Sequence, residues 1–124
     1  MKYLLENQLQ AYLRVDNSIE QFIGPIRIEE HTCLRWIHIS RTKSSYELRV
    51  HEVFDDRDVG VKSIYDFSYY EPDDIYGKEI GSFDLLENAL DTAEQIYNAE
   101  KGKYLPFGHM DEALKIFEIN NSKL

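Results

Sequence analysis

Four histidines and one cysteine are the side chains of this chain that are best suited to bind a transition metal. His31 and Cys33 are two positions apart, and zinc binds imidazole nitrogen and thiolate sulfur. A structural zinc site usually draws two such pairs from separate parts of a sequence, and here only one pair occurs. The other histidines are single residues without a second pair: His38, His51 and His109. The spacing therefore favours a small buried cysteine and ordinary surface histidines over a metal site.

Two groups of carboxylates could serve acid–base catalysis or hold calcium: Asp55, Asp56 and Asp58, then Asp73 and Asp74. Both groups lie beside glycine or proline in segments that we expect to be exposed loops, where carboxylates keep ordinary pKa values. A loop that starts at Asp55 has no glutamate at its twelfth position, so the EF-hand spacing is absent. The sequence also lacks a Gly-x-Ser-x-Gly elbow, a P-loop and a glycine-rich dinucleotide turn. We therefore expect a protein without enzymatic activity and without a cofactor.

Negative charge is concentrated in the middle of the chain. The 124 residues include 23 acidic and 14 basic side chains, which gives a formal net charge of −9. Residues 51–100 hold fourteen acidic and three basic residues, which gives that segment alone −11. Such a surface repels nucleic acid and anionic membranes and attracts basic molecules at long range. The charge predicts a basic protein partner, with neither direct nucleic-acid binding nor membrane binding.

Aromatic residues are interleaved with carboxylates between positions 65 and 76. Tyrosine gives an interface a rigid ring with a polar tip, and adjacent carboxylates can pair with arginine or lysine of a partner. Tyr65, Phe67 and Tyr69 are all odd-numbered and lie on one face of the expected strand, so we expect them in the core. Tyr70 and the loop residue Tyr76 are then left for a partner. The alternative, in which these residues serve only the core and solubility, stays open. The predicted partner-binding residues are Asp55, Asp56, Asp58, Tyr70, Glu71, Asp73, Asp74 and Tyr76.

Length and composition predict one domain over residues 1–124. Hydrophobic residues make up 43% of the chain and aromatic residues 13%, which is too many for a disordered chain. A single cysteine, Cys33, excludes an internal disulfide and fits a reducing compartment. The first residues lack the apolar core of a signal peptide, and no apolar run approaches the roughly 20 residues that cross a bilayer. We therefore expect a cytoplasmic protein.

Three consecutive segments have the composition of β-strands: residues 32–41, 45–55 and 61–71. In the second, apolar and polar residues alternate, which predicts one buried face. The connections between the segments are short and favour an antiparallel meander. Residues 26–28 could add an edge strand.

Helical spacing occurs at both ends of the chain. Residues 3–13 place Leu5, Leu9, Tyr12 and Leu13 on one face, and a second short helix is expected from Asp16 or Ser18 to Ile23. Gly24-Pro25 should end that second helix.

After a loop over 71–81, residues 83–100 form the clearest helical pattern, with Asp84 as N-cap and Gly102 as the stop. Its buried stripe should include Leu86, Leu90 and Tyr97. Residues 111–119 fit a last helix, although 114–119 fit a strand equally well. The expected fold is α+β, with an antiparallel meander sheet of three to five strands and helices packed over one face.

Residues 36–100 resemble immunity proteins of bacterial toxin–immunity systems, particularly those of contact-dependent growth inhibition. The resemblance rests on Trp36-Ile37-His38, the strand 46–55, the aromatic segment 64–67 and the helix opening 82–89. It covers about half of the chain. It implies a small cytoplasmic protein, without enzymatic activity, that binds and neutralises a toxin domain, often a nuclease.

The charge leads to the same expectation. A nuclease must bind phosphates, so its cleft tends to be basic, and an acidic protein is steered towards it. The predicted function is therefore neutralisation of a basic toxin domain in a 1:1 complex. Two alternatives remain: a nucleic-acid mimic that inhibits a DNA-binding protein, and a small ligand-binding α+β domain.

Overall fold

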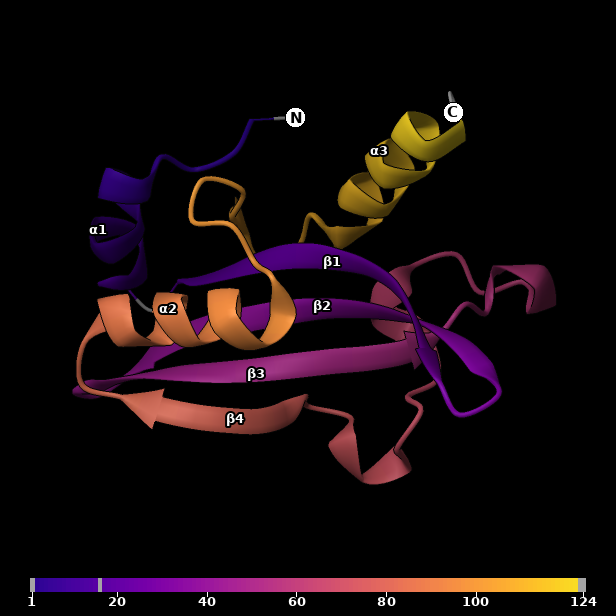
Figure 1. Ribbon diagram of the computed structural model, residues 1–124, viewed down its shortest axis with the longest axis horizontal. Helices are drawn as coiled ribbons and strands as arrows, with labels where there is room; N and C mark the ends of the chain where they lie inside the picture. The colour runs from indigo at the N-terminus through magenta and orange to yellow at the C-terminus, as the bar shows by residue number, and fades with distance from the viewer. Residues whose placement is uncertain (1, 16, 123–124) are drawn as a thin grey trace.

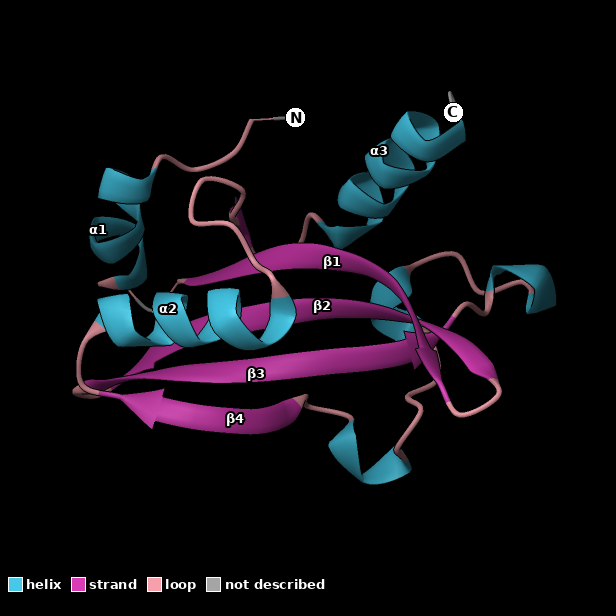
Figure 2. Ribbon diagram, viewed as in Figure 1, coloured by secondary structure: helices cyan, strands magenta, loops and turns pink. Residues whose placement is uncertain are grey.

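A five-stranded antiparallel sheet forms the centre of the protein, with strand order β4-β3-β2-β1-β5. The computed structural model describes residues 2–15 and 17–122 (Figure 1). Figure 2 shows the helices and strands by colour. The α+β class and the antiparallel sheet are confirmed. The strands are β1 (Ser18–Ile28), β2 (His31–Thr42), β3 (Ser45–Phe54), β4 (Lys78–Phe83) and β5 (Leu105–Pro106), and the helices are α1 (Leu9–Leu13), α2 (Leu86–Tyr97) and α3 (Met110–Ser122).

β1 occupies the segment for which the sequence predicts a short helix, and that prediction is wrong. Ile19, Glu20 and Gln21 are all buried, because both faces of the sheet are covered at this point. The sequence therefore lacks the alternation that marks a half-exposed strand. Gly24-Pro25 is not a helix stop but part of a β-bulge, and Gly24 has a φ of 132°.

The first core lies between the sheet and helices α1 and α2. The strands contribute the face that holds Ile37, Ile39, Leu48 and Val50. Leu9 and Leu13 of α1 are buried as predicted, whereas Leu5 precedes the helix and is exposed. Burial of Leu86 and Leu90 of α2 is confirmed, and Tyr97 is partly buried beneath the Arg35 guanidinium.

The ends of α2 differ from the prediction. Leu85 is the N-cap, without a side-chain hydrogen bond, so the expected cap by Asp84 is wrong. The helix ends at Tyr97, and its C-cap Asn98 lies in the left-handed region at φ 59°, before the predicted stop at Gly102. Asparagine tolerates this conformation better than most residues, so it ends a helix as glycine often does.

A second core covers the opposite face of the sheet. Leu34, Trp36 and Val53 lie on the opposite face of the sheet from the strand residues of the first core. They pack against α3 and the segment 61–69. Helices therefore lie on both faces, α1 and α2 on one and α3 on the other, so the prediction of helices over one face is wrong. The region 114–119, which fitted either structure, is helical in α3.

The predicted strand over 61–71 is wrong. Only Tyr69 forms a β-bridge, to Val53, and a short 3-10 turn occupies Ile64–Asp66. Asp111 at the start of α3 accepts hydrogen bonds from the Ser63 hydroxyl and the Ile64 amide, which draws the segment across the sheet face. The predicted loop 71–81 is correct only in its first part, because β4 begins at Lys78. None of the helices in the described ranges is long and apolar enough to cross a membrane.

Candidate functional site

Three acidic segments meet at one end of the sheet. Loop 55–60 follows β3, loop 71–77 leads into β4, and the β1–β2 turn carries Glu29 and Glu30 (Figure 1). Tyr70 joins two of the segments, because its hydroxyl donates a hydrogen bond to a Glu29 carboxylate oxygen at 2.6 Å. The fold thus brings together carboxylates that are far apart in the sequence. We call the loops 55–60 and 71–77 together the acidic loops.

Loop 71–77 presents its apolar side chains to solvent. Tyr76 is 79% exposed and Ile75 is 53% exposed. They directly follow Asp73, which is exposed, and Asp74, which is half-buried. Ile75 is absent from the predicted site residues, although an isoleucine among loop carboxylates was a visible signal. Exposed apolar groups ringed by charge are typical of protein interfaces.

Some of the carboxylates of loop 55–60 form hydrogen bonds that hold the loop in place. Asp55 binds the Arg57 guanidinium at 2.5 and 2.9 Å, and the hydrogen bonds from Arg57 lower the pKa of Asp55. Arg57 also binds Glu118 of α3. Asp56 accepts a hydrogen bond from the Ser68 amide at 2.6 Å. Asp58, which is exposed, has no side-chain hydrogen bond or ion pair to any described residue.

Tyr70, a predicted partner-binding residue, is half-buried. Its ring packs against Phe54 and His31, with centroids 5.7 and 6.0 Å away. The hydrogen bond to Glu29, with smaller contributions that include Glu71, raises the pKa of Tyr70 to about 12. Tyr70 therefore ties the start of loop 71–77 to the β1–β2 turn, and part of its ring stays exposed.

The floor of loop 71–77 is built from β3. Arg49 donates a hydrogen bond to the Gly77 carbonyl at 2.8 Å. Gly77 is buried at φ 87°, and a Cβ atom there would lie 2.8 Å from Nε2 of His51. Only glycine satisfies both the conformation and the close approach. The loop that carries Tyr76 is thereby fixed against the sheet.

His51 is itself held rigidly. Its ring stacks on Trp36, with centroids 4.6 Å apart, and Nδ1 shares a hydrogen bond of 2.5 Å with the Tyr69 hydroxyl. Burial, followed by the proximity of His38 and Arg49, lowers the pKa of His51 to about 3. The ring is therefore neutral at ordinary pH and serves as packing beneath the acidic loops. In the sequence, the only sign of this role is the odd-numbered position of His51 in its strand, which places its ring on the face opposite to Leu48 and Val50.

Glu20 is the centre of a buried polar network on the same face. Only 1% of the residue is exposed, and its carboxylate accepts hydrogen bonds from the Tyr65 hydroxyl at 2.6 Å and the Trp36 indole at 3.0 Å. The Gly108 amide adds a third bond at 3.2 Å. Burial raises the pKa of Glu20, and these hydrogen bonds oppose the rise. The network ties β1, β2, segment 61–69 and the start of α3 together.

No family model, curated protein or solved structure matches this chain. The basis for a functional proposal is therefore the geometry of the site itself.

The metal-binding candidates do not come together. Cys33 is buried, whereas His31 is exposed at the start of β2. Among residues 2–15 and 17–122, no three histidine, cysteine, aspartate or glutamate side chains are grouped to hold a metal ion. His38 and His51 lie near each other, with ring centroids 5.9 Å apart, but His51 uses its Nδ1 for Tyr69.

Proposed function

We propose that this protein is a cytoplasmic immunity protein that binds a basic toxin domain through its acidic loops and neutralises it in a 1:1 complex. The observation that carries the proposal is the exposure of Ile75 and Tyr76 in a loop that holds three carboxylates and no basic residue. Apolar anchors surrounded by charge match the organisation of a specific interface, which has a desolvated centre and a polar rim.

The acidic loops are prepared for binding by their anchoring. The Tyr70–Glu29 and Arg49–Gly77 hydrogen bonds hold the two ends of loop 71–77, which carries Tyr76. A loop that is ordered before binding loses less conformational entropy on association. Exposed carboxylates contribute mainly to the rate of encounter, because long-range attraction steers a basic partner towards them.

A nuclease domain fits this surface for a chemical reason. Its cleft must bind phosphates with arginine and lysine, and carboxylates can take the place of those phosphates. A standard interface buries roughly 800 Å² on each partner and involves about 20–30 residues. The acidic loops hold fewer residues than that, so the β1–β2 turn, which Tyr70 joins to them, should belong to the interface.

The test is co-expression with the C-terminal domain encoded by the gene immediately upstream. That domain should arrest growth alone and be harmless with this protein. In the purified pair, the triple variant Asp58→Asn, Asp73→Asn, Asp74→Asn should lower the association rate constant about tenfold at low salt. High salt should reduce the difference, because salt screens exposed charges. The matched control is Asp84→Asn, Glu87→Gln, Glu94→Gln, which removes the same charge from exposed positions around α2.

Equal association rates for the two triple variants would refute the acidic loops as the binding surface. A harmless neighbouring domain would refute the immunity function itself. Capture of a DNA-binding protein in place of a toxin would support the nucleic-acid mimic.

A further inference from the structure

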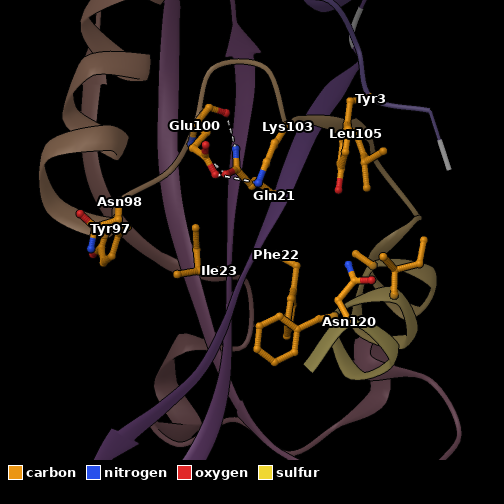
Figure 3. A pocket seen from close by; sticks show the side chains of 13 residues that line it. Tyr3, Gln21, Phe22, Ile23, Tyr97, Asn98, Glu100, Lys103, Leu105 and Asn120 are labelled. Carbon is orange, nitrogen blue, oxygen red and sulfur yellow. Dashed lines mark hydrogen bonds and ion pairs between the residues drawn. The ribbon is translucent and has the colours of Figure 1, made fainter. Parts of the chain in front are cut away.

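A groove of about 370 Å³ opens along the outer edge of β1 (Figure 3). Its floor is Gln21, Phe22 and Ile23 of β1. The end of α2, at Tyr97 and Asn98, forms one wall. The other wall is α3, through Ile116, Phe117 and Asn120. None of the predicted partner-binding residues lines this groove.

The floor of the groove is a sheet edge that continues beyond β5. β5 pairs with β1 only at Ile19 and Glu20. The Phe107 amide donates to the Ser18 carbonyl at 3.1 Å, so even-numbered residues of this part of β1 direct their backbone groups towards β5. By the same alternation, the N–H and C=O of Phe22 point into the groove, at the next hydrogen-bonding position of β1 beyond the end of β5.

The segment that precedes β5 does not fill this position. Before β5 it makes a turn in which the Lys103 amide donates to the Glu100 carbonyl. The Gln21 side chain fixes that turn with two hydrogen bonds to the Glu100 backbone, at 2.8 and 2.9 Å, drawn in Figure 3. The loop is thus held at the rim of the groove and away from the edge of Phe22.

The walls define what could occupy the edge. The Phe22 and Phe117 rings meet edge to face, 5.5 Å apart, and give the α3 side an apolar surface. Lys103 and Glu100 form an ion pair at 2.9 Å on the rim, so the groove carries no net charge from them. The β-bulge at Gly24 and the missing N–H of Pro25 end the usable edge after Ile23.

We propose that this groove binds a short extended peptide segment of a partner protein, which adds to β1 as a continuation of β5. Backbone hydrogen bonds to Phe22 hold the segment, and one apolar side chain packs on Phe22 and Phe117. Alternate side chains then point to the two walls, as in other complexes formed by strand addition. The occupant is uncharged where it meets the ion pair on the rim.

The experiment uses a phage-displayed library of random linear heptapeptides, selected on the full chain. Selected sequences should share an apolar residue flanked by uncharged ones, and a synthetic copy should shift the backbone amide NMR signals of Gln21, Phe22 and Ile23. Methylation of one backbone nitrogen in that peptide should weaken binding at least tenfold, because it removes a ladder hydrogen bond. Asn120→Trp, which fills the groove, should weaken binding similarly, whereas Lys115→Trp on the exposed part of α3 should not.

Thermal melts of both tryptophan variants should match that of the unmodified protein, which excludes misfolding as the cause. Failure to enrich any peptide, signal shifts elsewhere on the protein, or indifference to every N-methylation would overturn the proposal. The triple aspartate variant should bind the peptide with an unchanged dissociation constant, so this test is independent of the acidic loops.

Discussion

Arg49 and Gly77 connect the sheet to the loop that presents Tyr76. The arginine lies on β3, and its Nη1 donates to the glycine carbonyl 2.8 Å away. The same glycine has no space for a side chain, since an added Cβ atom would lie only 2.8 Å from Nε2 of His51. One backbone position therefore determines where the exposed residues of loop 71–77 stand.

Gly77→Ala should destabilise the protein and weaken partner binding. Alanine disfavours a φ of 87°, a strain on the order of 1–3 kcal/mol, and its Cβ would collide with His51. Gly60→Ala is the matched control, because Gly60 has a φ of 92° but no atom within 4 Å of the place that an added methyl group would take. Urea denaturation of the two variants measures their losses of unfolding free energy. Equal losses of unfolding free energy would show that the contact with His51 is unimportant.

Leu90→Ala should lower the free energy of unfolding by about 2–5 kcal/mol, because it leaves a cavity in the first core. Leu90 is 6% exposed and packs between α2 and the sheet. Ile96→Ala on the same helix is the control: Ile96 is 54% exposed, and its loss should cost much less. Hydrogen exchange should show slow amides over 86–97, and rapid exchange there would contradict the packing of α2.

Stability should fall in acid because of His51. Its pKa is near 6.5 in the unfolded chain and about 3 in the folded protein, so the unfolded state binds the proton more tightly. The stabilisation that comes from neutral His51 is complete above about pH 6.5 and is lost as the pH falls towards 3. In that range the slope of the unfolding free energy against pH approaches about 1.4 kcal/mol per pH unit for one proton. His38, whose pKa is also lowered, acts in the same direction.

Urea denaturation between pH 7 and pH 5 measures this effect. His51→Gln removes the titrating ring and should flatten the profile. The raised pKa of Glu20 acts oppositely, since the folded state holds that proton more tightly, but Glu20 is common to both proteins. Identical slopes for the unmodified protein and His51→Gln would contradict the buried neutral histidine.

Tyr76→Ala should weaken binding of the proposed toxin domain at least tenfold and change the free energy of unfolding by less than about 0.5 kcal/mol. The ring is 79% exposed and contributes little to the folded chain. Phe107→Ala, at another exposed aromatic position, is the control and should bind normally. Calorimetric titration measures the affinities, and equal dissociation constants for the two variants would remove Tyr76 from the interface.

The sequence alone determined the elements whose pattern depends on their own neighbours. Leu48 and Val50 alternate with polar residues along β3, and Leu86 and Leu90 recur at helical spacing in α2, so each pattern shows which face is buried. Charged residues beside proline and glycine likewise indicated the exposed loop at Tyr76.

Only the tertiary structure decided the rest, because the deciding partners are distant in the chain. β1 has no alternation, since Ile19 faces one core and Glu20 the other. The segment at Ile64 has strand-like residues, yet Asp111, 47 positions further on, takes its amide hydrogen bond. Burying a carboxylate is favourable only when donors surround it, and those of Glu20 come from three separate segments. Local periodicity carries no information about such partners, so the buried network around Glu20 could be found only in the folded chain.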